Sequence, residues 1–253
     1  MCVMSGKRNS NPFLLACAFL ALCVAGTPIP ARAEKLWLST GALPPITSSP
    51  GHPGFINELA RAAFGRIGVE VGVITVPTGR SLINVNDGID DGDIFRVAGA
   101  EAAFPNLIRI PEKTLDTDFV AYTKRSDIRI RTWADLQPFS VAFAAGWRPY
   151  ELNVKGVKEL TKTTSINELP ALLEKGRVDV ILMDRWQGQW VIRQSGYRFH
   201  LLEPPLVRYE MFMYLNKKHA ALVPKVAKAL ADMKADGSYQ QLYDLYLKPL
   251  AIR

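Results

Sequence analysis

Asp184 is the residue best placed for chemistry in this sequence, within the segment GRVDVILMDRWQGQW at residues 176–190. The apolar run at 178–183 is typical of a strand covered by helices on both faces, and a helix is expected at 184–194. Ligands of open α/β sheets bind outside the carboxyl ends of the strands. An acid at that point either caps the helix by accepting backbone N–H bonds or holds a ligand's ammonium group. By itself this segment favours the cap.

The sequence contains none of the common catalytic, nucleotide-binding or metal-binding motifs. It has no G-x-S-x-G, H-E-x-x-H, P-loop or G-x-G-x-x-G motif. The three histidines, His52, His200 and His219, are too far apart for metal-ligand spacing. The acidic cluster at 87–93 lacks the register of a calcium loop and is interpreted as a solvated turn. The sequence therefore predicts no catalytic residue, no metal site and no cofactor.

Strand and helix patterns alternate along the chain, which predicts the α/β class with a parallel sheet. The expected strands are residues 35–40, 70–76, 92–97, 107–110, 119–122, 140–144, 178–183, 199–202 and 209–215. The expected helices are residues 55–67, 80–89, 132–136, 148–154, 166–175 and 184–194, then a tail from 218 that Gly237 divides from a last helix at 239–247.

The N-terminal segment has the layout of a secretory signal peptide. Lys7 and Arg8 precede an apolar segment at 13–26, and an A-x-A site ends at Ala33. The apolar segment is shorter than the ~20 residues that a membrane span needs. We expect cleavage after Ala33, location in the periplasm, and a mature chain without cysteine, because Cys2, Cys17 and Cys23 precede the site.

The charge of the chain is mildly basic. Lys7, Arg8 and Arg32 would leave with the leader, which lowers the formal net charge from +7 to +4. No run of Lys and Arg is long enough to indicate a nucleic-acid partner. With 48% apolar residues, the chain has enough material for a large core.

Four segments, in order, resemble the family 3 bacterial periplasmic solute-binding proteins, the amino-acid-binding type. The family's G-F-x-x-[DE]-L-A helix is similar to residues 54–60, and its entry to the second lobe is similar to WADL at 133–136 before Val141 and Gly146. GRVD at 176–179 with Asp184 resembles a third family segment, and MKADGSY at 233–239 resembles the near-terminal one. Together these segments span nearly the whole expected mature chain.

The resemblance implies a periplasmic-binding-protein-like (type II) fold, with two α/β lobes joined by two crossing strands and a cleft between them. Lobe 1 would comprise residues 34–123 and 216–253, and lobe 2 residues 124–215. The crossing segments would be residues 119–122 and 211–215. Closure around a ligand in the cleft would be a hinge motion.

The resemblance also implies where a ligand would bind. The family commonly uses an acid at the position of Asp184 for the ligand's α-ammonium group. The family's carboxylate-binding arginine is missing from the segment at 100–105, and Ile46 replaces an aromatic residue. Arg96, Arg80 and Arg148 are the candidates for the anion contact, each with a surface ion pair as the alternative. Trp147 and Trp186 are candidates for stacking on a ligand or for filling space between helices.

Three functions remain open from the sequence. The first is a non-catalytic periplasmic protein, expected to be a monomer, that binds a small polar, amino-acid-like solute and delivers it to the permease of an ABC transporter. The second is an enzyme on the same scaffold, similar to cyclohexadienyl dehydratases, with Asp184 or Glu101 as the proton carrier. The third is a ligand-sensing module for a separate receptor.

Overall fold

Nine strands in the described part of the chain form one mixed sheet, in the order β2-β1-β3-β9-β5-β8-β6-β7, with β4 paired to β9. The computed structural model describes residues 1–3, 6 and 35–251, and the fold belongs to the unit Ala33–Arg253. The expected leader and its cleavage site lie almost wholly outside the described residues. No described helix is long and apolar enough to cross a membrane.

The strands follow the sequence patterns closely, except that one strand is not predicted from the sequence and two predicted strands form a single one. They are β1 (Leu36–Thr40), β2 (Val71–Thr75), β3 (Gly92–Val97), β4 (Leu107–Arg109), β5 (Leu115–Thr123), β6 (Ser140–Ala144), β7 (Glu159–Thr163), β8 (Val180–Asp184) and β9 (His200–Asn216).

Strand β7 is absent from the sequence-based prediction. It lies at the sheet edge, and its residues are mostly exposed, so it carries little of the apolar pattern that marks a strand. The two strands expected at 199–202 and 209–215 are one strand, β9. It pairs with β5 on both sides of an irregularity between Phe119 and Ala121, and with β3 and β4 near its end.

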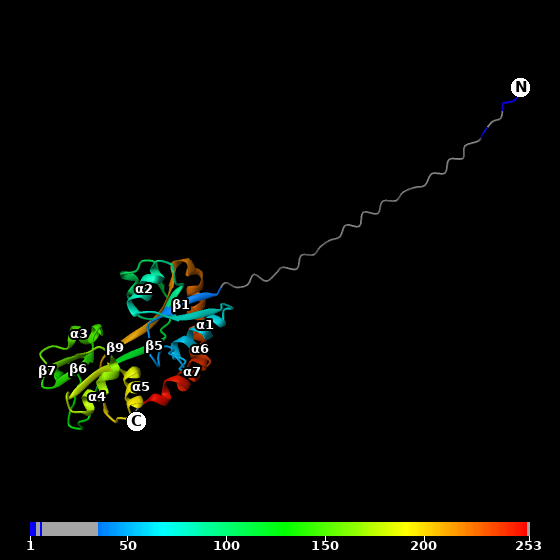
Figure 1. Ribbon diagram of the computed structural model, residues 1–253. Coiled ribbons are helices and arrows are strands. Elements are labelled where there is room, and N and C mark those ends of the chain that lie inside the picture. The colour runs from blue at the N-terminus through cyan, green and yellow to red at the C-terminus, as the bar shows by residue number, and fades with distance from the viewer. Residues whose placement is uncertain (4–5, 7–34, 252–253) are drawn as a thin grey trace. The chain divides into compact units, whose positions relative to one another are not determined.

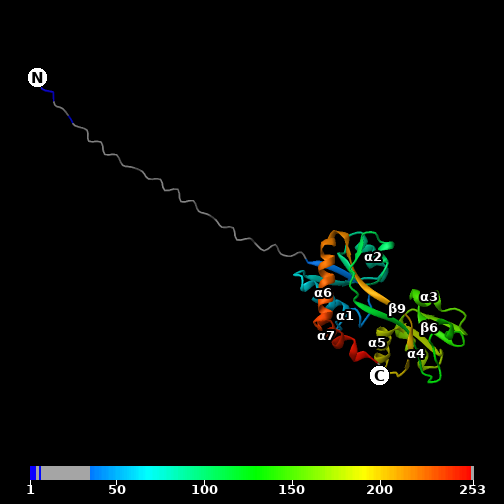
Figure 2. The same cartoon turned by 180° about the vertical axis from the view of Figure 1, so that it is seen from behind.

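Helices pack against the part of the sheet formed by β1–β3 and against the part that contains β6 and β8 (Figures 1 and 2). The α-helices are α1 (Phe55–Gly65), α2 (Thr78–Asn86), α3 (Arg148–Asn153), α4 (Leu169–Glu174), α5 (Arg185–Ser195), α6 (Val223–Ala235) and α7 (Ser238–Tyr246). Helices α1, α6 and α7 contact one another and lie together in both views, and α1 packs on β2 and β3. Helix α4 packs on β6 and β8.

Strand β8 is buried on both faces, as its continuous apolar run predicts. Val180 and Leu182 join one hydrophobic cluster, and Ile181 and Met183 join another on the opposite face. A separate cluster unites β1 and β3 with α1 and α6. Strands β6, β7 and β8 are parallel, so their carboxyl ends lie side by side. The same holds for the parallel strands β1, β2 and β3.

Gly54 permits helix α1 to begin directly against the loop that precedes it. The N–H of Phe55 donates to Pro45 O at 3.2 Å, and the N–H of Ile56 donates to Ile46 O at 2.9 Å. A Cβ at Gly54 would lie 2.2 Å from the carbonyl carbon of Thr47, and no side-chain rotation relieves a clash with backbone.

We therefore expect Gly54→Ala to lower the free energy of unfolding by at least about 2 kcal/mol through overpacking. Gly65→Ala is the matched control, because a Cβ there meets nothing within 4 Å and alanine has the higher helix propensity, so this variant should not lose stability. Urea unfolding of both variants measures the difference. Equal effects of the two substitutions would contradict the close packing at Gly54.

Candidate functional site

A cavity of about 560 Å³ lies at the carboxyl ends of the parallel strands. Its walls come from the loop after β1, the end of β3, the middle of β5, the loops after β6 and β7, the junction of β8 and α5, and β9. The lining residues are Ala42, Leu43, Ile46, Phe95, Arg96, Val97, Thr117, Phe119, Ala144, Ala145, Gly146, Trp147, Arg148, Thr164, Ser165, Ile166, Asp184, Gln187 and Met211. Its size is that of a small-molecule site.

Asp184 both caps helix α5 and presents an unused oxygen. Its Oδ1 accepts hydrogen bonds from the N–H groups of Trp186 (3.1 Å) and Gln187 (3.0 Å). Its Oδ2 is buried and has no hydrogen-bond partner among the described residues. The two interpretations of this residue are therefore compatible, because the cap occupies one oxygen and leaves the other.

The electrostatic surroundings of Asp184 favour its neutral form. Burial raises the pKa of the carboxyl to about 7, against the lowering effect of the two backbone hydrogen bonds. Asp118 raises this pKa further, and Arg185 lowers it. A ligand that brings a positive charge to Oδ2 would restore the carboxylate.

Gln187 and Thr117, neither of which the sequence predicts for the site, also present unused acceptor atoms. Gln187 Oε1 and Thr117 Oγ1 are buried without a hydrogen-bond partner, and both residues line the cavity. Two spacing signals point to them. Gln187 lies three residues after Asp184 on α5, and Thr117 shares the face of β5 with Phe119 through the two-residue period of a strand.

Arg96 lies in the cavity wall near the end of β3 and is 8% exposed. Its guanidinium forms an ion pair with Asp93 at 2.8 Å and donates to Phe95 O at 3.2 Å. Asp93 in turn accepts from the Ser81 hydroxyl and from the N–H of Phe95 at 2.9 Å. The sequence offers a surface ion pair as the alternative role of Arg96. The ion pair with Asp93 exists, but it is buried, and it holds the guanidinium in the cavity wall.

Trp147 and Arg148 lie where β6 turns into α3. Gly146 has φ +86°, a conformation that glycine adopts without strain. Trp147 is half-buried and packs edge-on against Phe119, with ring centroids 5.7 Å apart. Arg148 is exposed at the cavity, begins α3, and forms no ion pair with another described residue.

Two residues predicted for the site lie elsewhere. Arg80 is exposed in the first turn of α2, two residues later than the helix start, and does not line the cavity. Trp186 is 7% exposed in the core and packs edge-on against Tyr243 at 5.7 Å. It follows Asp184 by two residues on α5, and that turn of the helix directs it away from the cavity.

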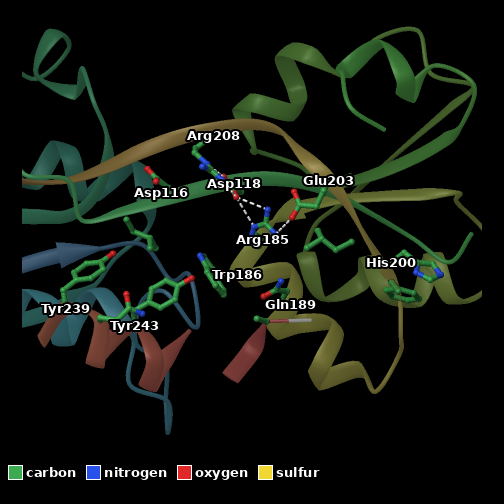
Figure 3. Close-up of a pocket in the computed structure, with 15 residues that line it drawn as sticks. Asp116, Asp118, Arg185, Trp186, Gln189, His200, Glu203, Arg208, Tyr239 and Tyr243 are labelled. Atoms are coloured by element: carbon green, nitrogen blue, oxygen red, sulfur yellow. Dashed lines mark hydrogen bonds and ion pairs between the residues drawn. The ribbon is translucent and has the colours of Figure 1, made fainter. Parts of the chain in front are cut away.

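A second cavity, of about 780 Å³, lies on the opposite face of β5. Asp116 and Asp118 line it, whereas Thr117 and Phe119 line the first cavity, as strand alternation requires. Figure 3 shows Trp186 in this second cavity, with the Tyr239 and Tyr243 side chains nearby.

Asp118 is the centre of an ion cluster in the second cavity (Figure 3). It accepts from Arg208 at 2.5 and 2.9 Å and from Arg185 at 3.0 Å, and Arg185 also pairs with Glu203 at 2.7 Å. Burial alone would raise the pKa of Asp118, but the hydrogen bonds from Arg208 and the charge of Arg185 outweigh burial and lower it. The cluster ties the first residue of α5 to strands β5 and β9.

The remaining carboxylate considered from the sequence, Glu101, does not line the first cavity. Its Oε2 accepts from the Tyr214 hydroxyl at 2.8 Å. Asp184 is thus the sole carboxylate among the described residues that line this cavity. No group of three or more His, Cys, Asp or Glu side chains in the described part of the chain is arranged to hold a metal ion.

Comparison with known proteins establishes the fold. No family model matches the sequence. An uncharacterized protein from Shewanella oneidensis is 23% identical over 192 residues, which are 71% of this chain and 70% of that protein.

Three solved structures illustrate the likeness. An ancestral arginine-binding protein bound to arginine has a TM-score of 0.66 at 22% identity, over 84% of this chain and 97% of that one. The GluR0 ligand-binding core from Nostoc punctiforme, in complex with L-glutamate, has a TM-score of 0.66 at 22% identity, over 83% and 98%. The substrate-binding protein of an amino acid ABC transporter has a TM-score of 0.65 at 19% identity, over 85% and 100%.

The chain has the type II periplasmic-binding-protein-like fold that these binding proteins share. The α/β fold class expected from the sequence is confirmed, and so, at the level of fold, is the resemblance to the family 3 solute-binding proteins.

The raised pKa of Asp184 predicts a pH dependence of stability for the unliganded protein. Between the ordinary value of 3.8 and about 7, the folded protein retains a proton that the unfolded chain has released. The free energy of unfolding therefore falls as pH rises through this window. Asp184→Asn keeps a capping oxygen and carries no charge, so at pH 8 it should exceed the wild type in stability by about 1–3 kcal/mol.

Urea unfolding of the wild type and Asp184→Asn at pH 5 and pH 8 measures this effect. The gap between the two proteins should be larger at pH 8 than at pH 5. A gap that does not change with pH would show that Asp184 is not held neutral by burial.

Proposed function

We propose that this protein is a periplasmic solute-binding protein that closes on a small, amino-acid-like zwitterion and delivers it to the permease of an ABC transporter. The unpartnered Oδ2 of Asp184 is the observation that carries the proposal. A buried acceptor without a partner costs about 1–3 kcal/mol, and a ligand ammonium group would remove that cost. Arg148, which lines the same cavity and forms no ion pair with a described residue, supplies positive charge for a ligand carboxylate, and the guanidinium of Arg96, paired with Asp93, lies in the same wall.

The organisation of the chain fits this role. Lobe 1, residues 34–123 and 216–253, and lobe 2, residues 124–215, would close on the ligand, with the cavity as their cleft. Strand β9 joins the β3 side of the sheet to β5, so bending of β5 and β9 is the natural hinge. The N-terminal leader would direct export. Three similar structures are of an arginine-binding protein, a glutamate-bound core and a transporter's binding protein, which supports an amino-acid-like ligand.

Thermal unfolding of residues 34–253 in the presence of amino acids, small carboxylates and amines tests the proposal. A ligand at a hundred times its Kd should add about 2.7 kcal/mol of stability. The stabilisation should disappear in Asp184→Asn. It should persist in Arg80→Ala, which removes an exposed arginine outside the cavity. Stabilisation that survives in Asp184→Asn would place the ligand elsewhere.

An enzyme on the same scaffold is the second candidate, and one observation favours it. A carboxyl with a pKa of about 7 is suited to general acid–base catalysis near neutral pH. Incubating the protein with each stabilising compound, followed by product analysis, separates the two functions. Substantial turnover that Asp184→Asn abolishes would replace the binding function with catalysis.

A further inference from the structure

The charges around the first cavity match the head group of a zwitterion and leave no charge for a side chain. Asp184 is the sole carboxylate among the described lining residues. Arg96 is compensated by Asp93 within its own ion pair, whereas Arg148 forms no ion pair with a described residue. One ammonium and one carboxylate group therefore balance the cavity. A cationic side chain would add a positive charge next to two arginines with no second acid to receive it.

The unpartnered polar atoms match an ammonium group in number and type. Asp184 Oδ2, Gln187 Oε1 and Thr117 Oγ1 are buried acceptors in one cavity, and each lacks a partner. An ammonium group carries three N–H donors and no acceptor. Gln187 is one helical turn from Asp184. Phe119 lies opposite Asp184 in the register of β5 and β8, and Thr117 precedes Phe119 by two residues on the same face of β5. The three acceptors thus come from adjoining parts of the structure.

The rest of the wall is largely apolar. Its large apolar side chains include Leu43, Ile46, Phe95, Phe119, Trp147 and Met211. Burying apolar ligand surface against such a wall contributes roughly 25 cal/mol per Å², whereas a charged side chain placed there would lose its hydration without a partner.

We propose that the ligand is an α-amino acid with an uncharged, apolar side chain, and that Gln187 and Thr117 join Asp184 in receiving its ammonium group. This inference rests on the proposed solute-binding function and specifies its ligand class. Arginine and glutamate, the ligands of two similar structures, are then excluded as the preferred ligands of this chain.

Calorimetric titration with leucine, methionine, phenylalanine, arginine and glutamate tests the ligand class. At least one of the three apolar amino acids should bind ten-fold or more tightly than arginine and glutamate. 4-Methylpentanoate, which is leucine without its amino group, should bind at least ten-fold more weakly than leucine. Preference for arginine or glutamate would overturn the ligand class but preserve the solute-binding function. Absence of binding by every amino acid would overturn both.

Gln187 and Gln189 form a matched pair for testing the ammonium contact. Both are 2% exposed, and both have a buried Oε1 without a hydrogen-bond partner. Gln187 lines the first cavity, whereas Gln189 lines the second, where it appears in Figure 3. Methionine has a length similar to that of glutamine and removes the buried oxygen that lacks a partner, so both methionine variants should fold.

Gln187→Met should weaken binding of the preferred amino acid by about ten-fold or more, because a hydrogen bond to a charged group is lost. Gln189→Met should bind as the wild type does. Neither substitution should change the affinity for 4-methylpentanoate, which has no ammonium group. Wild-type affinity in Gln187→Met, or equal losses in the two variants, would remove Gln187 from the ammonium site.

Discussion

The carboxylate of Asp184 is the group on which the arrangement of the site depends. One oxygen accepts two backbone N–H bonds and starts helix α5 at the end of β8. The other oxygen is buried at the cavity without a partner. In the proposed function, helix formation and ligand recognition use the same side chain, and the helix holds the free oxygen in a defined direction. Burial makes this oxygen costly in the unliganded protein and favourable for a cation.

The neighbouring residues Asp184 and Arg185 are an acid and a base and line different cavities, on the two faces of β5. Asp184 faces the first cavity, and Arg185 faces the second, where it joins Asp118 and Glu203. The ion cluster is largely neutral within itself and anchors the beginning of α5 from behind. Oδ2 of Asp184 has no such partner, so in the proposed function a cationic ligand would pair with this oxygen and restore the carboxylate. The alternation of β5 and the turn of α5 keep these two environments apart.

Arg96 illustrates why proximity to a cavity is not the same as availability. Its guanidinium is held by Asp93, which is itself held by Ser81 and a backbone N–H. This chain of contacts fixes the guanidinium in the wall and offsets its charge. Arg148 is exposed at the same cavity and is not offset by a described acid. With Arg96 offset by Asp93, the cavity has one acid, Asp184, and one arginine without a described ion-pair partner, Arg148. This charge balance suits a zwitterion.

The sequence by itself determined the α/β class, most strand positions and the place of Asp184, because buried strands and amphipathic helices impose apolar periods that are local. It missed β7, an exposed edge strand, and divided β9, whose middle residues carry no strand pattern. Only the tertiary structure decided which side chains share a cavity. It left Arg80 and Trp186 outside and brought in Gln187 and Thr117, because the direction of a side chain depends on helix phase and strand register across distant segments.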